Sequence, residues 1–186
     1  MASTIKVDNI QDSGGNSYLS SDGAGTFTTS NLGIDNTPSF YAIMSSNQNG
    51  IADDTFAKIQ FNSESWDTDS AYDPTTNYRF TVPSGEAGKY FFQANCYLQA
   101  ATANGSQVSV RLIKNGNNTT GSYGTETIVL GGSDNYIAEG NYGTTAIMNL
   151  SVGDYVEVYA KMNLASGNWN ALTNDAFFTG YKLIGV

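Results

Sequence analysis

A strict alternation of side chains over residues 88–99 constrains the fold of this chain more than any other feature. Apolar residues occupy every second position, and the intervening positions hold amides and aromatic rings. The first set is Tyr90, Phe92, Ala94, Cys96 and Leu98, and the second is Phe91, Gln93, Asn95, Tyr97 and Gln99. A period of two is that of a β-strand, whose successive side chains point to opposite faces of a sheet. The pattern therefore predicts a strand with one face in a core and the other partly covered, for which a neighbouring subunit is the simplest cover.

The same period recurs along the chain between turn signals. The expected strands lie within segments 39–46, 55–61, 108–116, 125–132, 144–162 and 176–186. Asn115-Gly116 is typical of a tight hairpin turn, and Gly153-Asp154 marks a second turn. With 20 Gly, 12 Tyr and 9 Phe in 186 residues, the composition favours one all-β domain.

The first 37 residues differ in character from the rest. They are rich in Ser, Thr, Gly, Asn and Asp and hold too few apolar side chains for a core of their own. We therefore divide the chain into an N-terminal segment, 1–37, and a head domain, 38–186. One interpretation of the segment is a flexible leader. The other is a short β-rich piece that orders against symmetry mates or a scaffold, with Ile5, Val7 and Ile10 as its buried side.

Charge and composition exclude several classes of function. The net charge is -9, which repels phosphate backbones and argues against a nucleic-acid partner. The chain contains no His, which removes histidine-based catalysis and most zinc sites. No apolar run is long enough for a secretion signal or a bilayer span, so we expect synthesis in a host cytoplasm and no membrane insertion. The single cysteine, Cys96, is expected to be a small buried thiol.

Five short sequence motifs between residues 72 and 183 resemble those of a known family. They are YDPTTNYRFTVP at 72–83, GKYFFQA at 88–94, the Lys-Asn-Gly hairpin at 114–116, LxxGDxV at 150–156 and FxGYxL at 178–183. In this order they resemble the globular heads of the complement one-q and tumour-necrosis-factor family. The resemblance implies an antiparallel jelly-roll β-sandwich that forms homotrimers and uses its outer loops for recognition.

The opening MASTIKVDNIQDSGG resembles the start of tail-fibre and other virion proteins of marine bacteriophages. Together the two resemblances predict a non-enzymatic virion protein whose trimeric head serves host attachment on a tail fibre or appendage. The resemblance implies that residues 1–37 are an attachment or oligomerisation segment that contacts other virion proteins, and that the head binds a host surface glycan or protein. The alternatives are a capsid decoration or cement protein and a cellular adhesion or signalling ligand of the same fold.

Candidate site residues follow from these expectations. Trp66 and Trp169 fall in expected loops, 63–77 and 163–175, and are candidates for holding a sugar; each could equally be a plug packed on the sandwich. Excess aromatic residues predict a trimer interface made of Phe91, Tyr97, Tyr155, Tyr159, Phe178 and Tyr181. We expect no catalytic residue and no cofactor, and treat carboxylates such as Glu64, Asp67, Asp69, Glu126 and Glu139 as solvated charges rather than a glycosidase pair.

The resemblance makes calcium a candidate ligand of the head, because some complement heads hold calcium near the three-fold axis. The candidate ligands are Asp53, Asp54, Asp67 and Asp69. The spacing after Asp67 lacks the glycine and the final glutamate of an EF-hand loop. Turn residues that bind no ion are the favoured interpretation of these carboxylates.

Overall fold

The chain divides into two compact units, which we describe separately. One comprises residues 1–36 with 184–186, and the other, the head, residues 37–183. The computed structural model describes residues 7–29, 36–101, 105–117, 122–129 and 137–184, with the backbone alone over 27–29 and 122–129. Every regular element in those ranges is a β-strand, so the all-β prediction is confirmed there. Within the same ranges there is no helix of the length and apolarity needed to cross a bilayer.

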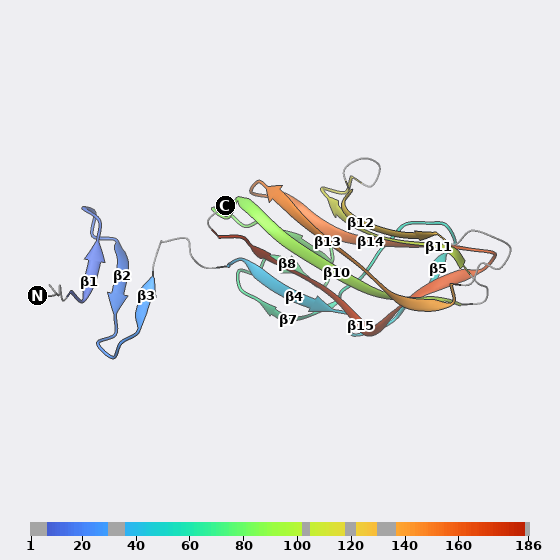
Figure 1. Cartoon of the computed structure of the whole chain (residues 1–186), viewed down its shortest axis with the longest axis horizontal. Helices are drawn as coiled ribbons and strands as arrows, with labels where there is room; N and C mark the ends of the chain where they lie inside the picture. Colours follow the sequence, from blue (N-terminus) through green and yellow to red (C-terminus); the bar gives the residue numbers. More distant parts are fainter. Residues whose placement is uncertain (1–6, 30–35, 102–104, 118–121, 130–136, 185–186) are drawn as a thin grey trace, which may run out of the picture. The chain divides into compact units, whose positions relative to one another are not determined.

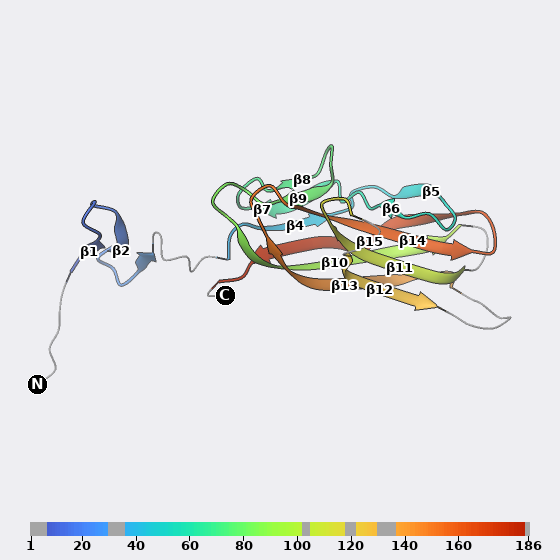
Figure 2. The ribbon, with the colours of Figure 1, turned by 90° about the horizontal axis from the view of Figure 1, so that it is seen from above.

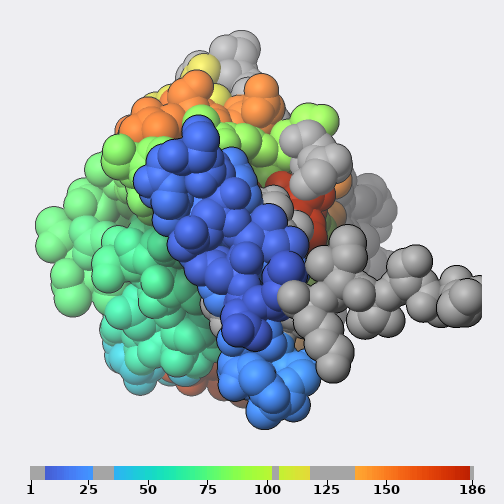
Figure 3. All heavy atoms as spheres, turned by 90° about the vertical axis from the view of Figure 1, so that its left-hand side faces the viewer, coloured from blue at the N-terminus to red at the C-terminus, as the bar shows by residue number. Residues whose placement is uncertain are grey.

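The small unit is a single antiparallel sheet, shown in blue in Figures 1 and 3. Its strands are β1 (Asn9–Gln11), β2 (Ser17–Ser21) and β3 (Phe27–Thr29), in the order β1-β2-β3. An aspartate closes each turn: the Asp12 carboxylate accepts the backbone N–H groups of Gly14 and Asn16 at 2.8 and 2.9 Å, and Asp22 accepts that of Ala24 at 2.7 Å. These bonds favour the ionised form and lower the pKa of both carboxyls, with the Asn16 side-chain bond the largest cause at Asp12.

The apolar side chains of this unit lie on its surface. Val7 and Ile10, predicted to form a buried side, are both exposed, and Ile5 lies outside the described residues. A lone three-stranded sheet gains independent stability only when a face of it packs against something. The burial of Val7 and Ile10 by a partner therefore stays a prediction.

The head is a sandwich of two six-stranded antiparallel sheets (Figures 1 and 2). The first, here the front sheet, has the order β13-β10-β15-β4-β7, with β5 paired to β15; the second, the back sheet, has the order β12-β11-β14-β9-β8, with β6 paired to β14. The front strands are β4 (Ser39–Ile43), β5 (Gln48–Ala52), β7 (Ser63–Asp67), β10 (Gly88–Ala100), β13 (Glu139–Leu150) and β15 (Asn168–Lys182). The back strands are β6 (Ala57–Lys58), β8 (Tyr72–Asp73), β9 (Arg79–Thr81), β11 (Gly105–Lys114), β12 (Ser122–Val129) and β14 (Tyr155–Leu164).

The core lies between the sheets and is centred on Phe40. Its ring stacks on Tyr72 and Phe80, with centroids 5.0 and 5.3 Å away, and meets Phe178 edge-on at 4.9 Å. The five alternate residues of β10 predicted to face a core are all fully buried there: Tyr90, Phe92, Ala94, Cys96 and Leu98. Burial of large aromatic side chains is the main favourable term in a domain of this kind.

The Tyr-Asp-Pro motif at 72–74 forms a tight turn that places Tyr72 in the core. The Asp73 carboxylate accepts backbone N–H groups of Thr75, Thr76 and Asn77 at 3.0, 2.9 and 3.1 Å. These bonds, led by that from Thr76, hold the pKa of Asp73 well below its usual value. The neighbouring Tyr72 is buried and donates its hydroxyl hydrogen to the Phe61 carbonyl at 2.9 Å, and burial raises its pKa far above 10.

Two segments differ from their predicted boundaries. The strand expected at 55–61 is reduced to β6, although Ile59 and Phe61 are buried as the alternation predicted. The expected loop 163–175 is mostly strand, because β15 begins at Asn168. Small and polar residues suggested a loop there, but the segment pairs with β10 on one side and β5 on the other.

Asp154 joins two neighbouring hairpin turns. Its carboxylate accepts from the Asn115 side chain at 2.7 Å and from the Ser151 backbone N–H at 2.8 Å, and pairs with Lys114 at 2.7 Å. These contacts, led by the bond from Asn115, lower its pKa to about 2. A carboxyl whose pKa falls on folding stabilises the protein above its unfolded pKa, roughly 3.9, and loses that contribution as the pH falls through the folded value.

We therefore expect Asp154→Asn to lower the free energy of unfolding at pH 7 by roughly 1–2 kcal/mol. The difference between variant and wild type should shrink as the pH falls from about 4 towards 2. Urea unfolding at a series of pH values measures both effects. Asp69→Asn, at an exposed loop position, is the matched control, and an Asp154→Asn effect of equal size at pH 7 and pH 2 would contradict the assignment.

Candidate functional site

The outer face of the front sheet carries aromatic and apolar side chains that the core does not use. On β10, Phe91 pairs with Ile147 of β13 and with Tyr181 of β15. The Phe91 and Tyr181 rings lie 5.3 Å apart. Ile147 is 63% exposed and Tyr181 36% exposed. We call Ile147, Phe91 and Tyr181 the apolar row; it is an exposed hydrophobic strip across three adjacent strands, the kind of surface that marks an interaction site.

A second group of rings lies further along the same face. Tyr41 of β4 stacks between Trp66 of β7 and Phe177 of β15, with centroid separations of 5.0 and 5.4 Å and interplanar angles of 23° and 14°. Trp66 is 51% exposed. We call these three residues the ring stack. Trp66 was predicted to fall in a loop, as either a sugar platform or a plug packed on the sandwich. It lies on β7, where its half-exposed ring rests on Tyr41, and its role in holding a sugar stays a prediction.

A cleft of about 320 Å³ opens beside the ring stack. It lies where β15 bulges: Asn95 pairs with Phe177 and Tyr97 with Leu172, so that residues 173–176 stand opposite Cys96 alone. The cleft is lined by Tyr41, Ile43, Met44, Asn95, Thr173, Asp175, Ala176 and Phe177. Bulges recur next to functional sites because they redirect side chains from the regular pleat.

Hydrogen bonds fix the shape of this bulge. The Asn95 side-chain N–H group donates to the Asp175 carbonyl at 2.7 Å and to the Asn141 side chain at 3.0 Å. The Thr173 backbone N–H donates to the Asn47 side chain at 3.0 Å. Asp175 has a φ of 51°, a left-handed conformation that costs a non-glycine residue of order 1 kcal/mol. Asn95 therefore holds the bulge in a conformation the chain does not favour by itself.

Three polar groups of the cleft are free to bind. The Tyr41 hydroxyl, the Thr173 hydroxyl and the Asp175 carboxylate make no hydrogen bond to another residue that the structure describes. No residue lining the cleft is cationic, and Asp175 is its one carboxylate. A glycosidase needs two carboxyl groups that flank the scissile bond, so this cleft has the groups for binding and lacks the pair for hydrolysis.

Three of the predicted interface residues lie elsewhere. Phe178 is fully buried in the core, so it cannot form a subunit contact in this structure, and its prediction was wrong.

Tyr155 and Tyr159 face outwards from the back sheet. The guanidinium of Arg79 lies 4.0 Å from the Tyr155 ring centroid and the Lys58 ammonium 6.0 Å from that of Tyr159. These rings therefore hold cations of their own chain. Tyr97 shares the front face with the apolar row.

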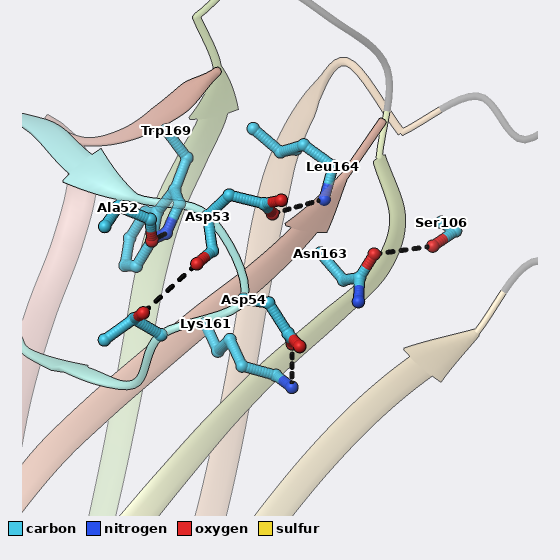
Figure 4. Close-up of polar contacts among 9 residues, drawn as sticks. Ala52, Asp53, Asp54, Ser106, Lys161, Asn163, Leu164 and Trp169 are labelled. Atoms are coloured by element: carbon cyan, nitrogen blue, oxygen red, sulfur yellow. Dashed lines mark hydrogen bonds and ion pairs between the residues drawn. The ribbon is translucent and has the colours of Figure 1, made fainter. Parts of the chain in front are cut away.

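Trp169 is fully buried, which contradicts its predicted role as a surface platform for a sugar. Its indole N–H donates to the Ala52 carbonyl at 3.0 Å. Figure 4 shows the loop that covers it: the Asp53 carboxylate accepts the Leu164 backbone N–H at 2.7 Å, and Asp54 pairs with Lys161. That ion pair is the main reason why the pKa of Asp54 is lowered.

The calcium candidates are spread over two separate loops and have protein partners. Asp53 and Asp54 belong to the loop over Trp169. The Asp67 carboxylate accepts the Tyr72 backbone N–H at 2.7 Å, and Asp69 accepts the Thr68 hydroxyl at 2.7 Å. Within the described ranges no three Asp, Glu, Cys or His side chains come together as a metal-binding group. The geometry fits the turn role of these aspartates.

The remaining carboxylates do not meet in a cleft either. Glu64 is exposed on β7, and desolvation together with nearby Asp67 raises its pKa. Glu139 accepts a hydrogen bond from the Gln99 side chain at 2.8 Å. The side chain of Glu126 lies outside the described residues.

Comparison with known proteins identifies the fold. No protein-family model matches the sequence, and no curated protein matches it. Two solved structures superimpose well on the head. Eiger TNF from S. frugiperda is 15% identical with a TM-score of 0.55, over 80% of this chain and 92% of that one. Murine APRIL is 12% identical with a TM-score of 0.54, over 78% of this chain and 98% of that one. The head is a tumour-necrosis-factor-like jelly roll.

The globular domain of zebrafish complement 1qA also aligns, at 15% identity and a TM-score of 0.46, over 79% of this chain and 98% of that one. The likeness to Eiger TNF and to murine APRIL establishes the fold of the TNF-like head, and at these identities it shows nothing about partners. The predicted jelly-roll sandwich is thus confirmed.

The cleft of the TNF-like head went unnoticed in the sequence for identifiable reasons. Tyr41 and Phe177 sit in strands whose alternation marks them as outward, but nothing local says that they stack on each other. Asp175 and Thr173 belong to a bulge, which breaks the period of two. The one available signal was Asn174-Asp175, a polar pair typical of a turn, directly before the apolar residues 176–178.

Proposed function

We propose that this chain is a non-enzymatic virion structural protein whose TNF-like heads form a homotrimer used in host attachment on a tail fibre or appendage. The observation that carries the proposal is the apolar row on the front sheet of the head. A jelly-roll monomer has no need to leave Ile147 63% exposed beside two aromatic rings. A closed cyclic oligomer buries the same strip on every subunit.

The trimer we propose is assembled through the apolar row. Its three residues lie on β13, β10 and β15, adjacent strands at one side of the front sheet. Tyr97 lies on the same face but six residues along β10 from Phe91, beyond the cleft residue Asn95, so its place in the contact stays a prediction. The resemblance to complement and tumour-necrosis-factor heads supports three as the number of copies, as does the solved TNF fold that the head matches.

The small unit serves as the attachment piece in this proposal. It forms a preshaped sheet whose turns are closed by Asp12 and Asp22, yet it buries little apolar surface. Other virion proteins would cover Val7 and Ile10, which are exposed in the single chain. The phage-like opening sequence supports a place in a virion after synthesis in a host cytoplasm.

The absence of enzymatic activity is supported by the chemistry of the cleft. Its single carboxylate is insufficient for glycoside hydrolysis, and a chain with no His has no histidine base. The net charge of -9 makes a nucleic-acid partner unfavourable.

The trimer is tested by mass in solution. Analytical ultracentrifugation of the wild type should give three times the mass of the 19.8 kDa chain. Ile147→Asp should give single chains, because a carboxylate would be buried unpaired at the contact. Since Ile147 is exposed in the single chain, thermal unfolding should still show a folded head.

Val152→Asp is the matched control. Val152 is 53% exposed, comparable to Ile147, and belongs to the turn between β13 and β14. This variant should remain trimeric. A monomeric wild type at micromolar concentration would refute the trimer, and a trimeric Ile147→Asp would refute the apolar row as its contact.

The place in the particle is tested by imaging. Gold-labelled antibody against the head should mark tail fibres or appendages of the intact particle. Label spread over the capsid lattice would instead establish the decoration role, and absence of label from purified particles would refute both.

A further inference from the structure

We propose that the cleft beside the ring stack binds a neutral, hydroxyl-rich ligand, namely one residue of an uncharged saccharide chain. The inference deepens the proposed function, because it rests on the head being a recognition module and names the ligand class. It begins from the lining of the cleft, which combines apolar surface with a few unpartnered polar groups. That combination is typical of small-molecule sites.

The apolar part of the site is rigid. Tyr41 and Phe177 are stacked nearly parallel, at an interplanar angle of 14°, and both line the cleft. Trp66 supports Tyr41 from the other side. Both faces of the Tyr41 ring are covered by Trp66 and Phe177, so a sugar would pack its C–H surface against Phe177 and the edges of the stacked rings. Stacked rings have few rotamers left to lose, so this wall is preformed.

The polar part of the site offers both donors and acceptors. The Tyr41 and Thr173 hydroxyls can each donate and accept, and the Asp175 carboxylate accepts. Among the described residues none of these groups has a hydrogen-bond partner of its own. A ligand with several hydroxyl groups can satisfy all three at once, whereas a purely apolar ligand would leave them unpaired, at a cost in affinity.

The charge of the lining decides against an acidic ligand. The cleft holds Asp175 and no Lys or Arg, and the whole chain carries -9. A sulfated or uronic-acid saccharide would be repelled, because recognition of such groups uses cations. A neutral saccharide has no such penalty.

Asn95 acts as a positioning residue. Its side chain holds the Asp175 carbonyl at 2.7 Å and thereby keeps Asp175 at its φ of 51°. This directs the bulge to the edge of the cleft. The site lies four residues along β15 from Tyr181, roughly 13 Å at the rise of a strand, so it remains open on the β4 side when the apolar row is covered.

The test uses the full-length wild-type chain and four neutral tetrasaccharides, of glucose, mannose, galactose and N-acetylglucosamine. The acidic probes are tetragalacturonate and dextran sulfate. Titration calorimetry measures affinity, and the fluorescence of half-exposed Trp66 reports binding next to the cleft. We expect at least one neutral tetrasaccharide to bind with a dissociation constant on the order of 1 mM or below, and neither acidic probe to bind.

Three conservative variants remove one polar group each: Tyr41→Phe, Thr173→Val and Asp175→Asn. Asn tolerates the left-handed conformation as Asp does, and Val has the shape of Thr, so the fold is kept. Each loss of a hydrogen bond should weaken binding about 3- to 10-fold. Thr76→Val, at an exposed turn away from the cleft, is the matched control and should bind like the wild type.

These experiments can refute the cleft proposal without refuting the trimer proposal. Sedimentation should show the same trimer mass for all cleft variants. Three results would each overturn the cleft proposal while leaving the trimer intact. The first is that no neutral tetrasaccharide binds at 10-fold above about 1 mM. The second is tighter binding of an acidic probe, and the third is unchanged affinity in all three variants. Saccharide binding by the monomeric Ile147→Asp variant would support the cleft independently of assembly.

Discussion

Replacing Trp169 with alanine should lower the free energy of unfolding of the head by about 3–5 kcal/mol, the cost of truncating a large buried aromatic residue. The indole is fully buried, and its N–H donates to the Ala52 carbonyl. The variant would leave a cavity under β5 and an unpaired carbonyl in the loop that Asp53 and Asp54 hold in place. Urea unfolding followed by circular dichroism, at one fixed protein concentration, measures the loss.

Trp66→Ala is the matched control for this experiment. Trp66 is 51% exposed and packs on Tyr41 at the surface, so its truncation should cost less than about 1 kcal/mol. Its effect should appear in saccharide binding instead. Equal destabilisation by the two variants would contradict the burial difference between them.

Gly180→Val should destabilise the head by about 3 kcal/mol or more, the upper range for overpacking a core. Gly180 lies near the end of β15, between Phe92 of β10 and Phe40 of β4. A Cβ at this position would lie 2.4 Å from Cδ1 of Phe92 and 3.0 Å from the Phe91 carbonyl oxygen. The Phe92 ring is itself held among other core rings, so it has no free space into which to move.

A compensating change sharpens the test. Gly180→Ala alone should also destabilise, and the double variant Gly180→Ala with Phe92→Leu should be more stable than the sum of the two single changes predicts, because the smaller side chain relieves the clash. Gly153→Ala serves as a contrast: no heavy atom lies within 4 Å of its Cβ position, and its strain comes from a φ of 83°. Strict additivity in the double variant would contradict a steric origin.

The sequence predicted the core of the head well because alternation reports burial directly. In β10 the two faces separate without exception, so the inward set could be read from residue spacing. In β15 the prediction put Phe178 and Tyr181 on one face, although residues three apart in a strand point to opposite faces; alternation with Tyr181 directs Phe177 outwards and Phe178 into the core. Phe178 was therefore assigned to the surface when Phe177 occupies it.

The candidate site was less predictable because it depends on neighbours distant in sequence. Trp66 was identified as a surface ring, but its partner Tyr41 is 25 residues away and lies in an adjacent strand. Tyr155 and Tyr159 do point outwards, as their alternation required. Their ring faces are occupied by Arg79 and Lys58, which are supplied by other strands.

The pairing of β4 with β15 also determines how the head reaches its native state. Phe40 stands opposite Gly180 in the register of the two strands, so a central part of the front sheet joins residues near opposite ends of the head. Contacts between residues so far apart in sequence stabilise the chain only after the long loop between them has closed. All-β domains therefore fold in the millisecond-to-second range. The two turns closed by Asp12 and Asp22 are local and should form on the microsecond scale of hairpins. Refolding should accordingly show the sheets of the head forming well after these two local turns.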